Sequence, residues 1–388
     1  MEDDRKSHAL RLFVSGLKLQ DFRNYTHASL RFKPRHVVFT GENGAGKTNL
    51  LEAVSLLSPG RGMRRANYAD MARAGSDNGF AVHADLQTPD GEVSLGTGNG
   101  ADGGGIEATR RMRVNGAPAK GADAFLEYLR VVWITPQMDG LFSGPSADRR
   151  RFLDRLVLAI DPAHGARVLD YEKSMRARNR LFDEGREDAR WLDAIEAQMA
   201  ELGVAIAAAR VELARLLNDM MRLLPQESPF PQAGLTLEGT LEEKLAASSA
   251  VELEEVCRFS LRASRHLDRA AGRALEGPHR SDLLARHLPK QMDAALSSTG
   301  EQKALLIGII LSHARLVAKI TGAPPLLLLD EIAAHLDQGR RAALFAIIDD
   351  IGAQALMTGT ERALFAGLGQ RAQFFTVAHG AVTQDEND

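Results

Sequence analysis

The sequence predicts an α/β protein whose head is built from both ends of the chain and is interrupted by an inserted α-helical arm domain. A glycine-rich turn, "GENGAGKT", stands between a short apolar run and a helical pattern, and "LLLLDE" near the other end has the composition of a buried parallel strand. The long stretch between them is rich in Ala, Leu, Arg and Glu, with apolar residues at three- and four-residue steps. We expect the head to combine a mixed β-sheet with an antiparallel β subdomain.

Composition changes place the domain boundaries. The N-terminal part of the head is expected at 1–145, the helical arm at 146–275 and the C-terminal part of the head at 276–388. Within the arm, the proline-rich "PQESPFPQAG" precedes a short strand, "LTLEG", and a helix predicted from Leu241 to Ala274. Strand and loop signals return at "GPHRSDLLARH".

The N-terminal part carries strand and turn signals. Apolar and polar residues alternate between Phe80 and Val114 around "TPDGE" and "VNGAP", which predicts an antiparallel meander with a flexible glycine-rich loop from Gly96 to Gly105. "VVWITPQ", beginning at Val131, predicts another buried strand. The closing "AVTQDEND" is expected to be disordered.

Composition excludes several classes of protein. With 44% hydrophobic and 26% charged residues, the 388-residue chain has the balance of a soluble globular protein. The single cysteine, Cys257, excludes an internal disulfide and a cysteine zinc site, and we expect it to be a small buried hydrophobe. The charged N-terminus lacks the apolar region of a secretory signal, and no apolar run is expected to cross a bilayer. A cytoplasmic protein with no membrane partner is therefore expected.

The motif "GENGAGKT" fits G-x-x-x-x-G-K-[ST] in the strand-loop-helix context that phosphate binding requires. Its backbone N–H groups and the helix dipole would hold phosphate oxygens, Lys47 would reach the β- and γ-phosphates, and Thr48 would bind Mg²⁺. The alternative is a glycine-rich turn that only caps a helix. We assign nucleotide binding to Gly41, Glu42, Asn43, Gly44, Ala45, Gly46, Lys47, Thr48 and Asn49.

Two adjacent carboxylates, Asp330 and Glu331, follow the apolar "LLLL". Successive strand residues point to opposite sides, so we expect Asp330 to hold Mg²⁺ and Glu331 to polarise the attacking water, with Lys47 as its catalytic partner. An Asp-Glu pair alone could simply cap a helix. About 280 residues separate Lys47 from Asp330, and a nucleotide-binding domain needs roughly 100 to 200 in all. The arm is therefore an insertion.

The order of motifs resembles that of the ABC-type ATPase superfamily with its SMC branch, and more closely that of the RecF family. The shared order is a phosphate loop, a glutamine after a strand, a Ser-x-Gly turn with a helix, "LLLLDE" and then "HLD". The likeness covers nearly the whole chain. Its motifs are "LKLQDFRNY", "GENGAGKTNLLEAV", "RVNG", "RRRFLDR", "GPHRSDL" and "STGEQK".

The resemblance implies roles for residues whose chemistry the sequence alone does not reveal. Arg23 and Asn24 would lie beside the nucleotide phosphates, Gln137 would sense Mg²⁺ and the γ-phosphate, and Asp337 would belong to the D-loop. Without the resemblance, Arg23 and Asn24 could be a polar pair at a sheet edge and Gln137 a loop residue. "GPHRSDL" departs from the more usual GPHRDDL at Ser281, and neither His279 nor Arg280 receives a chemical step.

The Ser-x-Gly turn is expected to act on a second copy of the chain. In the superfamily, Ser298 and the N–H of Gly300 would meet the γ-phosphate bound by the other subunit, so that two heads enclose two ATP molecules. Glu301 stands where many relatives have Gln, and Lys303 adds a further cation. The superfamily's switch histidine has no counterpart, since Thr358 or Thr360 occupies its place, which predicts slow hydrolysis.

Basic residues near the phosphate loop and the "VNG" hairpin are candidates for contacts with duplex phosphates. A solvated charged surface is the alternative for any one of them. "RRRFLDRL" in the arm could likewise face DNA, or could be a helix start held by Asp148 and Asp154. The candidates are Arg61, Arg64, Arg65, Arg110, Arg111, Arg113 and Lys120.

The resemblance implies an ATPase that dimerises on ATP and duplex DNA and helps to load RecA, with RecO and RecR, at single-strand/double-strand junctions. A chromosome-organising SMC head is the main rival, but it predicts a coiled coil several times longer. The ATPase subunit of a membrane transporter would carry the switch histidine. A binding module without hydrolysis is disfavoured by Lys47, Asp330 and Glu331.

Overall fold

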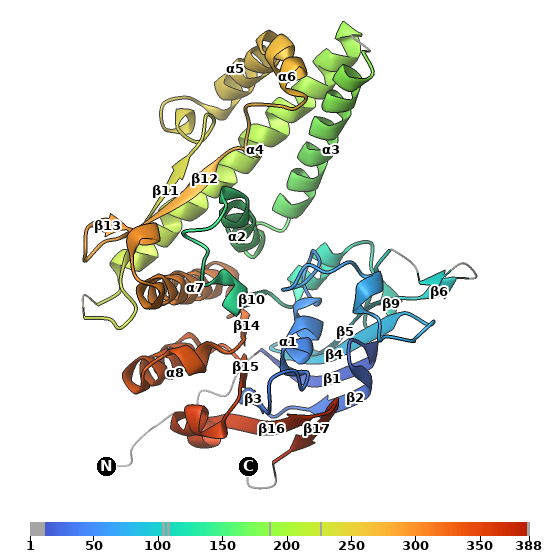
Figure 1. Ribbon diagram of the computed structural model, residues 1–388, viewed down its shortest axis with the longest axis vertical. Coiled ribbons are helices and arrows are strands. Elements are labelled where there is room, and N and C mark those ends of the chain that lie inside the picture. The colour runs from blue at the N-terminus through green and yellow to red at the C-terminus, as the bar shows by residue number, and fades with distance from the viewer. Residues whose placement is uncertain (1–11, 103–104, 107–108, 186–187, 226, 386–388) are drawn as a thin grey trace. The chain divides into compact units, whose positions relative to one another are not determined.

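A computed structural model describes residues 12–102, 105–106, 109–185, 188–225 and 227–385 (Figure 1). The chain divides into two compact units. The first unit holds residues 1–139 and 313–388, and the second holds 140–312. Both ends of the chain therefore contribute to one unit, as the spacing of the motifs predicts.

The first unit contains two six-stranded sheets. One is wholly antiparallel, with the spatial order β2-β1-β4-β5-β8-β9, and it is the predicted meander extended by the N-terminal hairpin. Its strands are β1 (Phe13–Phe22), β2 (Tyr25–Arg31), β4 (Phe80–Thr88), β5 (Gly91–Asn99), β8 (Arg111–Val114) and β9 (Ala117–Pro118).

The other sheet has the order β10-β14-β15-β3-β16-β17 and is parallel except at β17. All five residues of β3 and all four leucines of β14 are buried, which matches the composition of strands covered on both faces. Its strands are β3 (His36–Thr40), β10 (Val131–Ile134), β14 (Leu326–Leu329), β15 (Ala355–Gly359), β16 (Ala372–Ala378) and β17 (Ala381–Gln384).

An apolar cluster fills the space between these two sheets, and helix α1 (Lys47–Ser55) packs within it. Leu17 and Val82 come from the antiparallel sheet, Phe39 from the parallel sheet and Leu50 from α1. The shorter elements of this unit are β6 (Ala101–Asp102), β7 (Gly105–Ile106), η1 (Ala69–Met71), η2 (Ala122–Glu127), η3 (Pro136–Met138), η6 (Ile332–His335), η7 (Arg362–Arg371) and the helix α8 (Gln338–Ile351).

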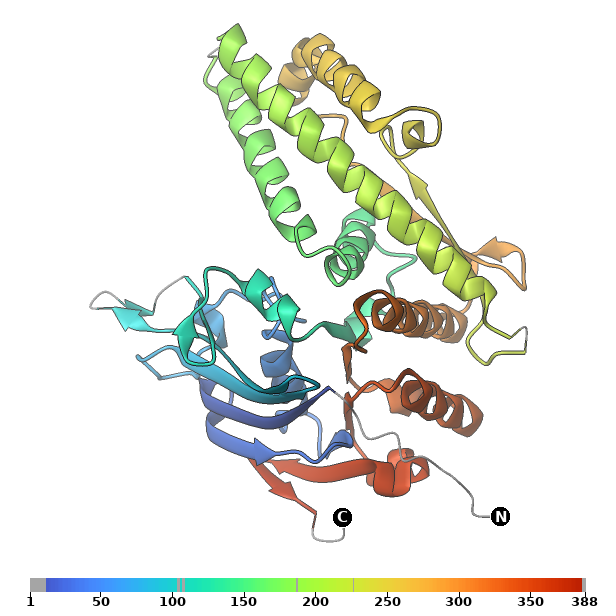
Figure 2. The same ribbon diagram turned by 180° about the vertical axis from the view of Figure 1, so that it is seen from behind.

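The second unit is the helical arm with a small sheet. Helices α3 and α4 run side by side, as both Figure 1 and Figure 2 show, and α4 also packs on β11 and α5. Its elements are α2 (Ser146–Leu158), α3 (His164–Asp183), α4 (Ala189–Arg222), β11 (Ala233–Glu238), η4 (Lys244–Ala246), α5 (Ala250–Ala263), α6 (Arg265–Ala271), β12 (Asp282–His287), β13 (Met292–Asp293), η5 (Ala294–Leu296) and α7 (Thr299–Thr321), the last of which continues into the first unit.

A buried ionic group links four helices of the arm, α3, α4, α5 and α6. The Arg178 side chain on α3 is fully buried, and its guanidinium donates to Glu196 of α4 over 2.9 Å, to Asp268 of α6 over 2.6 Å and to the Leu261 carbonyl over 2.7 Å. Because removing one partner of a buried ion pair leaves an uncompensated charge, loss of any one of these charged side chains should destabilise the arm.

Three sequence-based expectations about local structure are wrong. The helix predicted from Leu241 to Ala274 is broken into η4, α5 and α6, because Ser249 starts a new helix with a capping box to Glu252. The expected flexible loop at Gly96 to Gly105 is instead the end of β5 followed by β6 and the start of β7, and 103–104 lie outside the described residues. The tail forms β17 as far as Gln384.

Two further expectations need adjustment. Residues 276–312, assigned by composition to the head, pack with the arm unit, because β12 pairs with β11 along its whole length. Among the described residues, α7 is long and apolar enough to span a membrane, contrary to the expectation from the sequence. Its most apolar window is 72% buried within the protein, as in the core helix of a globular protein.

Candidate nucleotide site

The predicted phosphate loop joins β3 to α1 at the carboxyl ends of the parallel strands. Three of its glycines have left-handed backbones, with φ of 147° at Gly41, 81° at Gly44 and 113° at Gly46. A Cβ at Gly41 would lie 2.2 Å from the Val377 carbonyl oxygen, and one at Gly46 would lie 2.4 Å from Nδ2 of Asn24. Glycine is therefore required at both positions by conformation and by space.

Lys47 is the first residue of α1, and its ammonium group points back into the loop. Its Nζ donates to the carbonyl oxygens of Gly41 over 2.7 Å and Glu42 over 2.8 Å. Burial lowers the pKa of Lys47, and the nearby carboxylates of Glu331 and Asp330 oppose that effect. The cation thus lies at the centre of the loop with both acids close enough to influence it.

Asp330 is the centre of a hydrogen-bonded cluster at the carboxyl ends of three neighbouring strands. Its Oδ1 accepts from Thr48 Oγ1, which follows β3 and the loop, over 2.9 Å, and from Thr358 Oγ1, on β15, over 2.8 Å. Burial raises the pKa of Asp330, while the two hydroxyls and the charge of Arg64 lower it. Residues 282 positions apart in the chain are thereby brought into direct contact.

Glu331 follows Asp330 directly and is the N-cap of η6. Its backbone is left-handed, with φ of 52°, and its N–H donates to Thr358 Oγ1 over 2.9 Å. Left-handed backbone at a non-glycine residue is costly and is typical of functional sites. Thr358 therefore bonds both acids: its hydroxyl donates to the Asp330 carboxylate and accepts from the Glu331 backbone N–H.

The donor set fits Mg²⁺. Thr48 and Asp330 supply hydroxyl and carboxylate oxygens, which Mg²⁺ prefers. Gln137 is exposed beyond the end of β10, which pairs with β14 so that Ile134 lies opposite Leu329. Gln137 and Asp330 therefore follow adjacent strands of the sheet. Among the described residues, no group of three or more His, Cys, Asp or Glu side chains offers a rival metal site.

Arg23 and Asn24 both contact the phosphate loop or its helix. Asn24 Nδ2 donates to the Ala45 carbonyl over 3.1 Å, and its Oδ1 accepts from Asn49 over 2.7 Å. Arg23, with φ of 55°, forms two bonds to the buried carboxylate of Glu52 on α1, at 2.8 and 2.6 Å. The sequence did not single out Glu52, whose position on the buried face of α1 gives no local signal of an ion pair.

The Ser-x-Gly turn directly precedes and begins α7. Ser298 and Gly300 are exposed, and a Cβ at Gly300 would meet nothing within 4 Å. Lys303 is only 5% exposed, so it lies on the inner side of α7 rather than on the exposed turn, contrary to the expected cationic contact. Asp337 is the N-cap of α8 and accepts from the Arg340 N–H over 2.8 Å.

The candidate DNA contacts fall into two groups. Arg110 is wrong for this role, because its guanidinium donates to the carbonyls of Leu56, Ser58 and Gly60 and its Nε to Thr97. Arg64 bonds Asn49 and Glu52, and Arg61 bonds Asn67, but both keep exposed side chains. The other exposed candidates are Arg65, Arg111, Arg113 and Lys120.

Comparisons with known proteins identify the family. The RecF/RecN/SMC N-terminal domain family matches residues 13–383. A DNA replication and repair protein RecF of Mesorhizobium japonicum is 62% identical over 96% of this chain and 98% of its own length. The chain belongs to the RecF family. A second relative with the same description, from Brucella suis, is 59% identical over 96% of each chain.

Solved structures agree with the fold of this RecF-family chain. The recombination mediator protein RecF-ATPrS of the RecFOR pathway superimposes with a TM-score of 0.83, covering 97% of this chain and 99% of the other at 24% identity. An SMC head from Pyrococcus furiosus gives a TM-score of 0.52 at 16% identity, covering 96% of each chain. The predicted ABC-type ATPase head with an inserted helical arm is confirmed, as is an ATPase of DNA replication and repair.

Two motifs of the family that lacked a chemical step bind each other in the arm. Arg149 of α2 forms paired 2.7 Å bonds to Asp282, and Arg150 donates to the Ser281 carbonyl over 2.7 Å. His279 bonds Tyr171 and the Ala274 carbonyl, and burial lowers its pKa. "RRRFLDR" thus includes a helix start fixed to "GPHRSDL", which favours the structural alternative for Arg149 and Arg150.

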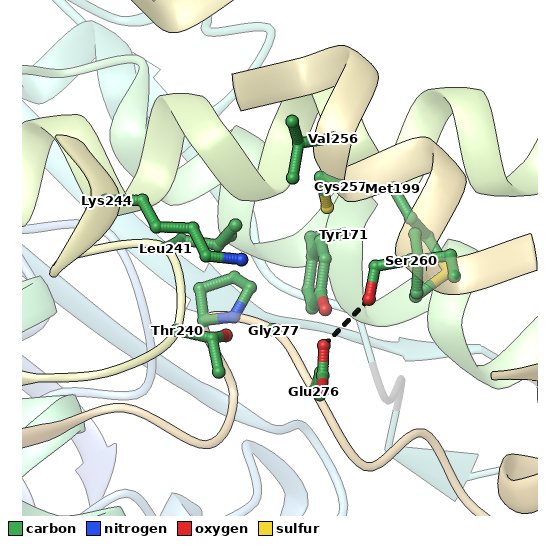
Figure 3. Close-up of a pocket in the computed structure, with 12 residues that line it drawn as sticks. Tyr171, Met199, Thr240, Leu241, Lys244, Val256, Cys257, Ser260, Glu276 and Gly277 are labelled. Atoms are coloured by element: carbon green, nitrogen blue, oxygen red, sulfur yellow. Dashed lines mark hydrogen bonds between the residues drawn. The ribbon is translucent and has the colours of Figure 1, made fainter. Parts of the chain in front are cut away.

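Figure 3 shows a cavity in the arm that does not belong to the nucleotide site. Its volume is about 20 Å³, and Cys257, Tyr171 and the hydrogen-bonded pair Ser260 and Glu276 are among its lining residues. That space accommodates about one water molecule and no nucleotide. Cys257 is half-buried rather than fully buried as expected, and burial raises the pKa of its thiol to about 11, which disfavours the reactive thiolate.

Proposed function

We propose that this chain is a slow, ATP-driven switch in which two copies close around two ATP molecules while bound to duplex DNA. The observation that carries the proposal is the contact of Asp330 with Thr48 and Thr358, which joins the phosphate loop to the catalytic acids. Thr48 and Asp330, with Gln137, would hold Mg²⁺, which supplies positive charge at the phosphates when bound.

The remaining roles follow from the position of each residue. Backbone N–H groups of 41–49 bind phosphate oxygens, and Lys47 offers its ammonium to the β- and γ-phosphates. Glu331 orients and polarises the attacking water. Thr358, a neutral donor in contact with Asp330, cannot take up and return a proton as a histidine does, which supports slow hydrolysis.

Head-to-head closure is supported by the exposure of Ser298 and Gly300 at the start of a long helix. An exposed helix N-terminus with an uncrowded glycine offers N–H groups to an anion brought by another molecule. Although 276–312 pack with the arm unit, we propose that 276–388 act as the C-terminal part of the ATPase head, with 1–145 as its N-terminal part and 146–275 as the arm. Asp337 would lie at the same interface as part of the D-loop.

Duplex DNA is the expected nucleic-acid partner, bound through exposed basic side chains without reading the base sequence. We propose action in the cytoplasm at gaps and junctions of single- and double-stranded DNA, with RecR, RecO and RecA as partners. A relative named for DNA replication and repair and a solved structure named for the RecFOR pathway support this proposal. A chromosome-organising SMC head remains the second candidate. It is disfavoured because the longest arm helix, α4, has only 34 residues.

Sedimentation with ATP, Mg²⁺ and duplex DNA tests the switch. The wild-type chain should become a dimer, whereas Lys47→Arg and Ser298→Arg should each remain monomeric and hydrolyse ATP at least tenfold more slowly. Ser298→Arg should still bind a fluorescent ATP analogue, because Ser298 is proposed to act on the partner's nucleotide.

Mixing the two variants provides the control. A mixed dimer contains one site with an intact Lys47 and an intact Ser298 from opposite chains, so the mixture should regain hydrolysis that neither variant has alone. A wild-type chain that stays monomeric, or a mixture without recovered hydrolysis, would contradict the shared site.

A further inference from the structure

The turn formed by residues 298–300, here called the signature turn, is held from one side by a carboxylate. Oε2 of Glu301 accepts from the Ser298 N–H over 3.0 Å, in the Ser-x-x-Glu arrangement of a capping box. Gln302 holds the other side, where its Nε2 donates to the Ser297 carbonyl over 2.9 Å. The conformation of the turn therefore depends directly on Glu301.

Glu301 is itself fixed by Lys290, which lies in the turn between β12 and β13. The Lys290 ammonium forms an ion pair with Oε1 of Glu301. That turn is well defined, because the Lys290 N–H donates to His287 Nδ1 over 3.3 Å and Arg286 donates to the Gln291 carbonyl over 2.9 Å. Lys290, and then Ser298, lower the pKa of Glu301 to about 2, so the carboxylate is charged at neutral pH.

A charged carboxylate at this place has two opposite effects on nucleotide binding. It fixes the backbone of the signature turn, which should favour the geometry needed for a phosphate. It also brings a negative charge to the N-terminus of α7, where the partner's γ-phosphate would bind, and like charges repel. A neighbouring cation removes the second effect while it preserves the first.

We propose that Lys290 is a positioning residue of the signature turn, which holds Glu301 in its capping position and neutralises it so that the turn accepts the phosphate of a second subunit. Lys290 acts through Glu301 and makes no contact with nucleotide. This inference rests on the proposed closure of two heads. It assigns a task to the β12–β13 turn, which no sequence motif covers.

Dimerisation at low and high salt tests the charge effect. Lys290→Ala should weaken ATP-dependent dimerisation by about tenfold at low salt, and the deficit should shrink at high salt, where charges are screened. The matched control is Lys319→Ala, which removes an exposed lysine from the other end of the same helix and should dimerise like the wild type.

Rescue separates this effect from simple loss of structure. Glu301→Gln keeps an oxygen that can accept from the Ser298 N–H but carries no charge, so it should dimerise at least as well as the wild type. The double variant Lys290→Ala with Glu301→Gln should recover to within about twofold of the wild type. A double variant as weak as Lys290→Ala would overturn the proposal, as would normal dimerisation of Lys290→Ala at low salt.

A measurement on the nucleotide-free chain distinguishes this inference from the proposed function. Amide hydrogen exchange at Ser298 should quicken severalfold in Lys290→Ala, because Glu301 is then less firmly held. If the wild-type chain fails to dimerise, the closure of two heads is contradicted. The exchange result still tests whether Lys290 holds the Ser298 backbone through Glu301. If exchange at Ser298 is unchanged in Lys290→Ala, the positioning role is refuted even where closure stands.

Discussion

Asp330 is a residue whose proposed function and contribution to stability oppose each other. It is buried at the carboxyl end of β14 and accepts hydrogen bonds from Thr48 and Thr358. Burial nevertheless raises its pKa, which means that the folded chain binds a proton at this carboxyl more tightly than the unfolded chain does. At neutral pH the buried negative charge therefore lowers the free energy of unfolding, and a bound cation would offset this loss of stability.

Asp330→Asn should therefore stabilise the nucleotide-free protein while it abolishes hydrolysis. With a raised pKa, the stability contributed by this group is present below the unfolded pKa and is lost as pH rises through the folded pKa. Asparagine does not ionise and keeps an acceptor for both threonines. We expect the melting temperature to rise by about 1–3 °C at pH 8 and the difference to vanish toward pH 4.

Asp337→Asn is the matched control, because Asp337 is an exposed cap of α8 whose pKa is lowered, first by the Arg340 N–H. Asparagine also caps helices well, so this variant should not gain stability at pH 8. Equal gains in the two variants at pH 8 would show that the burial of Asp330 is not responsible.

At the scale of elements, Arg110 connects the antiparallel meander to the end of α1. It lies immediately before β8, and its guanidinium satisfies the carbonyls of Leu56, Ser58 and Gly60. Burial lowers the pKa of Arg110. Arg113, three residues later and within β8, is exposed. Arg110 therefore has a structural task, whereas the exposed Arg113 is a proposed contact with duplex DNA.

Arg110→Ala should cost about 2–4 kcal/mol of unfolding free energy, because it leaves several carbonyls without a donor. Arg113→Ala should leave stability within about 0.5 kcal/mol and weaken duplex binding similarly for all base sequences, with a salt slope reduced by about 1. Chemical denaturation and a salt titration of DNA binding measure the two effects. A stable Arg110→Ala chain that binds DNA poorly would reverse these assignments.

The pair Arg110 and Arg113 also shows where sequence-based prediction ends. The phosphate loop and Asp330 were predictable because their chemistry depends on local spacing and on an apolar strand that precedes the acids. Which arginine is buried depends on carbonyls about 50 residues away, and no local pattern records that. The buried ion group of Arg178 was missed for the same reason, since its three partners lie on other helices or their ends.

At the scale of the whole molecule, all predicted contacts to one nucleotide within a chain lie in the first unit. The phosphate loop, Gln137 and Asp330 belong to residues 1–139 and 313–388. The arm has its own apolar clusters around Tyr171 and Leu241. Each unit therefore has a core that can melt as a cooperative transition.

Calorimetry of the full chain without DNA should show that ATP with Mg²⁺ raises the midpoint temperature of the first unit's unfolding transition and not that of the second. At 100 times its dissociation constant, ATP adds about 2.7 kcal/mol to the unit that binds it, which corresponds to several degrees. Lys47→Ala should remove most of that shift and leave the other transition in place. An equal shift of both transitions would mean that the units unfold together.

The place of β3 in its sheet has a consequence for synthesis of the protein on the ribosome. The strand is made early, yet both of its neighbours, β15 and β16, come from the last 40 residues of the chain. Until those residues emerge, the apolar β3 has two unpaired edges, which are sites of aggregation. The nascent chain must protect this strand through nearly the whole of translation, so a ribosome that stalls within the arm leaves a fragment that cannot complete the parallel sheet.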